Sequence, residues 1–248
     1  MSVKLAPVVA GLVAALLAVP ATASLAAGPG RPSCRAGVLH PVGTPTTAFA
    51  AIAGRSGADV YERPGGRRLA HFRRLNVNRY PTTFWIVGAI VTRTCSTSWY
   101  RLKLPIRPNG AVGYVRPADV LVAKVRTRIE VDLSARKLSF YKGRRLVLRT
   151  PVAVGSPATP TPTGRFYVNQ RLVPANPDGA FGPAALGVSA FSDVLTGWAQ
   201  GGPIGIHGTN EPWSIGRAVS NGCIRVPNET LKRLFAATPG GTPVVIHP

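Results

Sequence analysis

Glycine and proline divide this chain into short segments. Its 248 residues include 27 glycines and 24 prolines, and the runs between them are rich in apolar and β-branched residues. Glycine weakens helices and strands, proline breaks them, and both favour turns. Hydrophobic residues make up 45% of the chain and charged residues only 16%. This composition predicts a globular protein built mainly from short strands and turns.

The beginning of the chain has the composition of a secretory signal. Lys4 precedes an apolar run over residues 5–20, and Ala-Thr-Ala at 21–23 offers a cleavage site. These features are typical of signals that are removed on export. An uncleaved anchor is the alternative, but the run is shorter than the roughly 20 residues that a spanning helix needs. We therefore predict that residues 1–27 are a signal peptide and that the mature protein is secreted or held in the cell envelope, without a stable membrane span.

The chain is strongly basic, with 30 lysines and arginines against 9 acidic residues and a formal charge of +21. Such a charge favours polyanionic partners, namely nucleic acid, anionic lipid or acidic polymers of the cell wall. Because the chain is expected to be exported, we predict no nucleic acid partner and regard anionic wall polymers as a candidate.

Three cysteines, Cys34, Cys95 and Cys223, are present. In an oxidising compartment two of them can pair and one is left over. Cys34 and Cys95 both lie in the first half of the chain, which favours a disulfide between them. Cys223 is then a free thiol, which an exported protein has reason to keep if the thiol is reactive.

Two domains are predicted after the signal. Residues 28–50 lack periodicity and are rich in Gly, Pro, Thr and Ala, which predicts a linker. Residues 51–123 hold about five short strands with turns between them, a pattern that fits a small barrel. Residues 124–248 alternate apolar and polar positions in hairpin-like pairs. One short helix is predicted there, with Asn228 as its N-cap.

The first domain resembles bacterial SH3-like domains. The resemblance rests on Trp-Tyr-Arg at 99–101, Gly-Tyr-Val at 113–115 and the Pro-Gly-Gly turn at 64–66. It implies a small β-barrel over residues 51–123 that binds cell-wall peptides or glycans. A packing module without a ligand remains the alternative.

The second domain contains residues suited to thiol chemistry. His207 ends an apolar strand, and Cys223 follows a Ser-Asn-Gly turn. A free thiol is mostly protonated at neutral pH, so an imidazole that takes its proton and the nearby guanidinium of Arg225 would both favour the reactive thiolate. Gly208 and Gly222 leave room for a peptide backbone, and their amides, with that of Cys223, are candidate donors to an oxyanion.

Each of these residues also has an ordinary structural interpretation. A lone cysteine in a β domain is more often a buried apolar residue than a nucleophile, and Arg225 could merely anchor a loop. No second histidine or carboxylate stands at metal-ligand spacing, so no metal site is predicted. No cofactor is implied either.

Residues 125–248 resemble the L,D-transpeptidase catalytic domain, also called YkuD-like. His-Gly-Thr-Asn at 207–210 is followed by Ser-Asn-Gly-Cys-Ile-Arg-Val at 220–226, which places Cys223 sixteen positions after His207. Thr-Pro-Thr-Gly-Arg-Phe at 161–166 and Gly-Thr-Pro-Val at 241–244 match two further segments of that family. Each piece is short, but the combination is specific.

The resemblance implies a β-sandwich-like catalytic domain with one short helix. It also implies that Cys223 attacks a peptidoglycan tetrapeptide stem at the third residue, releases D-Ala and forms a thioester that an amine of a neighbouring stem resolves. His207 would be the base, and the backbone carbonyl of Gly208 would orient its imidazole. Arg225 would stabilise the thiolate or a substrate carboxylate.

The turn before the cysteine departs from the family pattern at one position. Ser220 and Asn221 would shape this turn, but many family members carry histidine where Asn221 stands. Any imidazole contribution to the oxyanion site is therefore missing here.

Two alternatives remain open. With water as the acceptor, the same chemistry would make an L,D-carboxypeptidase. The chain could also be a catalytically silent protein that binds the cell wall.

Overall fold

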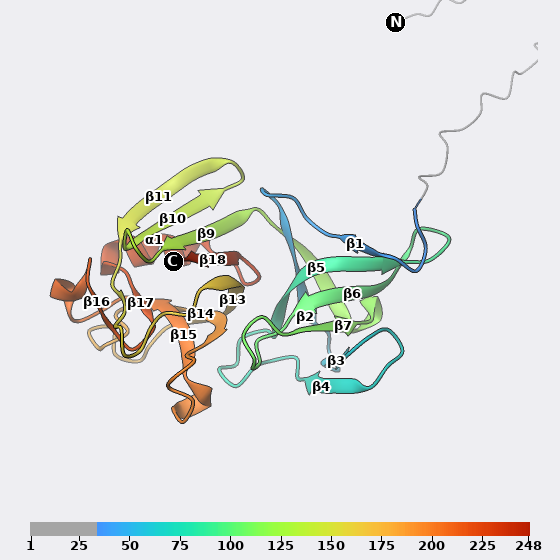
Figure 1. Ribbon diagram of the computed structural model, residues 1–248, viewed down its shortest axis with the longest axis horizontal. Helices are drawn as coiled ribbons and strands as arrows, with labels where there is room; N and C mark the ends of the chain where they lie inside the picture. Colours follow the sequence, from blue (N-terminus) through green and yellow to red (C-terminus); the bar gives the residue numbers. More distant parts are fainter. Residues whose placement is uncertain (1–33) are drawn as a thin grey trace, which may run out of the picture. The chain divides into compact units, whose positions relative to one another are not determined.

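The computed structural model describes residues 34–248. The predicted signal peptide and the first residues of the predicted linker lie outside this range. The described residues form one compact unit with two eight-stranded sheets, one two-stranded sheet and one α-helix. A mainly β fold with one short helix is therefore confirmed (Figure 1).

The first sheet contains strands β1 to β8. Its order is β4-β3-β7-β6-β5-β2-β8, with β1 paired to β5. Apolar side chains such as Val60, Phe84, Ile86 and Leu102 alternate along these strands into a shared core. The strands are β1 (Leu39–Pro41), β2 (Ala48–Ala53), β3 (Ala58–Tyr61), β4 (Arg68–Phe72), β5 (Thr83–Val91), β6 (Thr97–Lys103), β7 (Val112–Val115) and β8 (Val120–Val125).

The predicted limits of the first domain need two corrections. Residues 39–50, predicted to be linker, contribute β1 and the beginning of β2 to this sheet. Small and polar residues in this segment obscure the alternation that is typical of a strand. The two strands form because β5 and β8 supply their hydrogen-bond partners. The predicted boundary at residue 124 also falls inside β8, and the first sheet ends at Val125. The resemblance to SH3-like domains stays a prediction.

The second sheet forms the larger part of residues 126–248. Its order is β11-β10-β9-β18-β13-β14-β15-β17, and β12 pairs with β16 separately. The strands are β9 (Thr127–Asp132), β10 (Lys137–Lys142), β11 (Arg145–Pro151), β12 (Val154–Gly155), β13 (Gly164–Leu172), β14 (Ala185–Phe191), β15 (Pro203–His207), β16 (Ala218–Ser220), β17 (Ile224–Arg225) and β18 (Pro243–His247).

Helix α1 (Asn228–Ala237) covers part of the core of the second sheet. Its Leu231 and Leu234 are buried, and Phe235 packs at the edge of the same cluster. The predicted cap is wrong by one residue, because Pro227 occupies the N-cap position and Asn228 is the first helical residue. The Asn228 side chain makes hydrogen bonds elsewhere, as described below.

The two large sheets contact each other through a small apolar cluster. Trp85 of β5 and Tyr167 of β13 are buried in it, together with Ala48, Ala50 and Val125. The guanidinium of Arg165 also lies 5.5 Å from the Trp85 ring centroid. Because this contact is largely apolar, we expect it to hold one sheet against the other.

The cysteines are paired as the sequence suggests. Cys34 and Cys95 form a disulfide across 61 residues, and Cys223 is a free cysteine. Within residues 34–248, no helix is long and apolar enough to cross a membrane.

Candidate active site

Two parallel strands bring the predicted histidine and cysteine to neighbouring positions. In the β15–β17 pair, Ile206 lies opposite Ile224 and His207 opposite Arg225. Cys223 directly precedes β17, so its sulfur reaches the middle of β15. The backbone N–H of Gly205 donates to Cys223 Sγ at 3.4 Å. His207 also borders Gly205, since a Cβ added there would meet His207 Cδ2 at 3.8 Å.

The imidazole of His207 is held in one tautomer. His207 is buried, and its Nδ1 lies 2.5 Å from the carbonyl oxygen of Gly208. A carbonyl oxygen can only accept, so Nδ1 carries the hydrogen and Nε2 keeps its lone pair. The ring of Phe181 meets the imidazole edge-on, with centroids 4.9 Å apart. This arrangement leaves Nε2 as the atom that can take a proton.

Burial keeps both groups neutral at rest. It lowers the pKa of His207 to about 4; the positive charge of Arg225 adds to this effect, and the hydrogen bond to Gly208 opposes it. Burial raises the pKa of the Cys223 thiol, against the opposing effects of the Gly205 N–H and Arg225. At neutral pH the site therefore holds a thiol and a neutral imidazole, and a thiolate must be made by proton transfer.

The turn before the cysteine is held by hydroxyl groups. Ser220 Oγ donates to the carbonyl oxygen of Cys223 at 2.6 Å and accepts from the Gly222 N–H at 3.2 Å. Thr161 Oγ1 donates to the Gly222 carbonyl oxygen at 2.9 Å. Gly222 has φ +100°, a conformation that favours glycine. Asn221 is exposed at the tip of this turn.

The glycine amides proposed as oxyanion donors have partners inside the protein. The Gly222 amide is engaged by Ser220 as described, and the Gly208 amide donates to the Ala184 carbonyl at 3.4 Å. The prediction for these two amides therefore needs correction, because the hydroxyl of Ser220 in the turn occupies one of them and the backbone carbonyl of Ala184 occupies the other. The amide of Cys223 remains the candidate donor.

Arg225 lies beside the pair and has an acidic partner. It forms an ion pair with Glu211, which comes four residues after His207 in the sequence. Glu211 was not among the predicted site residues. An acidic side chain so near the histidine motif, in a chain with only 9 acidic residues, is a signal that could have pointed to it.

The sequence analysis also did not predict that Asn228 contacts the loop that follows His207. Its Oδ1 accepts from the Thr209 N–H at 2.8 Å, and its Nδ2 donates to the Thr209 carbonyl at 3.1 Å. These two bonds hold the loop that follows His207 against α1. A Cβ on Gly208 would meet Asn228 Oδ1 at 2.3 Å, so only glycine fits between them.

We expect Asn228→Ala to destabilise the protein, because the buried Thr209 loses a partner for each of its backbone polar groups. An unpaired buried polar group costs about 1–3 kcal/mol, which corresponds to a fall in Tm of roughly 2–4 °C per kcal/mol for a chain of this size. Thermal unfolding measures the effect, with the exposed Asn210→Ala as the matched control. Equal melting temperatures for both variants would show that the two bonds do not stabilise this loop.

No group of three or more histidine, cysteine, aspartate or glutamate side chains that could hold a metal ion is found within residues 34–248.

Comparison with known proteins places this site in a recognised domain. Residues 126–246 match the family model described as the YkuD L,D-transpeptidase catalytic domain. YkuD of Bacillus licheniformis, named as a candidate L,D-transpeptidase, is 43% identical over 121 residues, which cover 49% of this chain and 66% of that protein. YqjB of Bacillus subtilis, named in the same way, is 35% identical over 159 residues, covering 60% of this chain and 82% of that protein.

The chain thus spans slightly less than two thirds of the two YkuD proteins that it matches, 66% in Bacillus licheniformis and 65% in Bacillus subtilis. Among solved structures, the catalytic domain of the Enterococcus faecium L,D-transpeptidase is 30% identical, with 49% of this chain and 96% of that chain covered and a TM-score of 0.36. An L,D-transpeptidase from Mycobacterium smegmatis is 18% identical, with 58% and 76% covered and a TM-score of 0.39.

Proposed function

Because the chain belongs to the L,D-transpeptidase family with a YkuD catalytic domain, we propose that it cross-links peptidoglycan stem peptides through a thioester on Cys223. The observation that supports this most directly is the bond from His207 Nδ1 to the Gly208 carbonyl, which leaves Nε2 free to accept a proton. The sulfur of Cys223 lies beside the same strand, and Cys223 as a residue is half-buried.

In the first half of the proposed reaction, His207 Nε2 takes the thiol proton as Cys223 Sγ attacks the carbonyl of the third stem residue. Arg225 and the Gly205 N–H favour the charge that forms on sulfur. As the tetrahedral intermediate collapses, the C–N bond to the terminal D-Ala breaks. The imidazolium returns its proton to the leaving amine, and a thioester remains.

In the second half, an amine from a neighbouring stem attacks the thioester carbonyl. His207 accepts a proton from this amine and passes it to the departing sulfur, so that the thiol is restored and a new amide joins the two stems. Water in place of the amine would give a free carboxylate and an L,D-carboxypeptidase. A silent wall-binding protein would do neither.

The experiment that tests this proposal is product analysis with a tetrapeptide stem, with and without an acceptor amine. A transpeptidase is expected to release D-Ala and to join the stem to the amine in stoichiometric amounts. A tripeptide product that forms equally well in the presence of the amine would identify a carboxypeptidase. No release of D-Ala would leave only the wall-binding role.

The proposal extends to the location of the protein and to a partner of its basic surface. We propose that the protein works in the cell envelope, after removal of residues 1–27, and that its basic surface and first domain hold it against anionic wall polymers. The formal charge of +21, to which residues 1–27 contribute only Lys4, supports this part of the proposal. Sedimentation with purified cell walls at low and high salt tests it, since screening should release the protein.

We expect the rate of acylation to be nearly flat with pH between the two pKa values. Below a pH of about 4, His207 becomes protonated and can no longer accept the thiol proton, so the rate falls. Arg225→Gln removes a positive charge that lowers the pKa of both groups, so the acid limb should move to higher pH. The pH dependence of acylation measures the shift, with the exposed Arg217→Gln as the matched control. An acid limb that stays in place would contradict the role of Arg225.

A further inference from the structure

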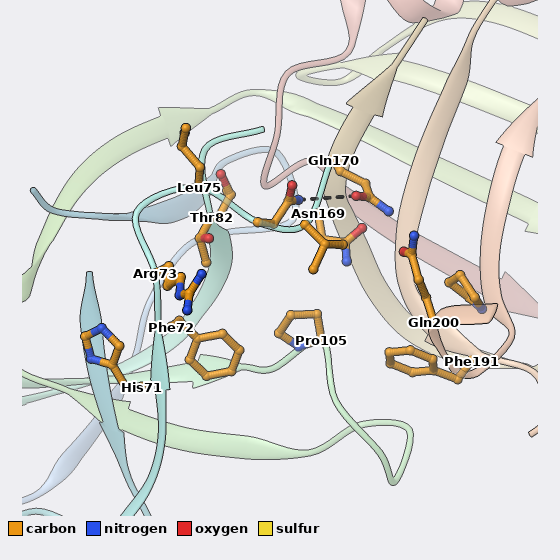
Figure 2. Close-up of a pocket in the computed structure, with 14 residues that line it drawn as sticks. His71, Phe72, Arg73, Leu75, Thr82, Pro105, Asn169, Gln170, Phe191 and Gln200 are labelled. Atoms are coloured by element: carbon orange, nitrogen blue, oxygen red, sulfur yellow. Dashed lines mark hydrogen bonds between the residues drawn. The ribbon is translucent and has the colours of Figure 1, made fainter. Parts of the chain in front are cut away.

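A pocket of about 600 Å³ opens between the two large sheets, near the candidate active site. Figure 2 shows residues of the first domain, among them Phe72 and Arg73, facing Gln170, Phe191 and Gln200 of the second domain, with Pro105 between them. Both domains therefore build this pocket.

Side-chain amides form hydrogen bonds between the two walls of the pocket. Asn76 Nδ2 and Asn78 Nδ2 donate to Gln170 Oε1, at 3.2 and 2.6 Å. On the other side, Asn109 Nδ2 donates to the Phe191 carbonyl at 2.7 Å, and Asn109 Oδ1 accepts from the Phe191 N–H at 2.9 Å. Because both sides are tied across the two domains, the pocket is largely formed before any ligand arrives.

One row of paired residues connects the pocket with the sulfur. Gln170 of β13 lies opposite Gly187 of β14, and Gly187 lies opposite Gly205 of β15. The Gly205 N–H donates to Cys223 Sγ. Neighbouring strands are about 4.8 Å apart, so this row spans roughly 10 Å. An extended chain of about three residues covers that distance.

The pocket also lies on the side of the sulfur away from the histidine. Pro203 lines the pocket, and its carbonyl oxygen is 4.0 Å from Cys223 Sγ, whereas His207 stands at the other end of β15. In the proposed reaction, the leaving amine must be near His207 to receive its proton. The acyl part of the donor then extends toward Pro203 and the pocket.

The lining suits a peptide that carries a negative charge. None of the lining residues is acidic. Arg73 is exposed and forms no ion pair with any residue of the described range. Apolar rings of Phe72 and Phe191 complete the walls.

We propose that this pocket binds the part of the acyl donor that precedes the reacting carbonyl, an extended segment of about two residues that bears a carboxylate. Arg73 would pair with its carboxylate. The inference rests on the proposed function and makes the first domain a wall of the substrate site.

The test compares two donors that differ only in this segment. One is the full tetrapeptide, and the other is the dipeptide of its last two residues, which lacks the part that would enter the pocket. We expect Arg73→Ala to lower the ratio of kcat/KM for the tetrapeptide over the dipeptide about tenfold, since a bond to a charged group is lost. Arg74→Ala, an exposed neighbour outside the pocket, is expected to leave the ratio unchanged.

The outcomes also separate this inference from the proposed function. Turnover of the tetrapeptide with a tetrapeptide-to-dipeptide ratio that does not respond to Arg73→Ala would overturn the pocket assignment alone. No turnover of the tetrapeptide by the unmodified chain would overturn the function, and the pocket assignment with it.

Discussion

Cys223→Ala is expected to remove all covalent labelling of the protein by a carbapenem. The proposed chemistry requires a thiol at the end of the turn before β17, where the Gly205 N–H and Arg225 favour the thiolate. Alanine keeps the turn but has no nucleophile. We expect acylation to fall by more than about a thousandfold, to the level of background hydrolysis. Intact-mass measurement after exposure to the carbapenem detects the single added acyl group.

The matched control for this variant keeps Cys223 and removes the other two cysteines. The double variant Cys34→Ala, Cys95→Ala has a single thiol and should still gain one acyl group at a rate close to that of the unmodified chain. Labelling of Cys223→Ala at a comparable rate would show that another residue is the nucleophile, and the proposed mechanism would then fail.

His207→Ala is expected to slow acylation at neutral pH by about a hundred- to ten-thousandfold, the usual contribution of general acid–base catalysis. The thiol of Cys223 has a raised pKa, so without an imidazole it stays protonated at neutral pH. Raising the pH should restore part of the rate, because the thiolate then forms without a base. The unmodified protein should show no such rise over the neutral range.

Stopped-flow or mass measurements of acylation against pH check this prediction. His247→Ala is the matched control, since His247 is exposed at the end of β18. A rate for His207→Ala equal to that of the unmodified chain at pH 7 would exclude His207 as the base.

The sequence predicted those features that depend on short segments. The mainly β fold, the short helix near the end and the carbonyl of Gly208 as the partner of His207 are found in the structure. Motifs such as His-Gly-Thr-Asn contain these residues within a few positions of each other. Their geometry therefore follows from the local conformation of the chain, and a short motif is enough to predict it. The Cys34–Cys95 disulfide is found too, although it spans 61 residues, because the chain has only three cysteines that can pair.

Features that depend on strand register could not be predicted from the sequence. Gly205 meets Cys223 only because β15 and β17 pair in parallel, and Asn76 and Asn78 reach Gln170 from more than 90 residues away. Asn228 was recognised as a polar residue at the helix start, but its Thr209 partner could not be foreseen. Strands β1 and β2 lack a strong pattern of their own, and their partners determine them.

The protonated state of Cys223 has a consequence for how the molecule stays intact. A thiolate attacks disulfides, and a chain that holds one free cysteine and one cystine can scramble its own crosslink. The surroundings that raise the pKa of Cys223 also disfavour its thiolate, which is the nucleophile that this exchange requires. The same protonation slows oxidation of the sulfur by peroxide, since sulfenic acid forms from the thiolate. We therefore expect the sulfur to stay reduced in the resting site until it attacks a substrate.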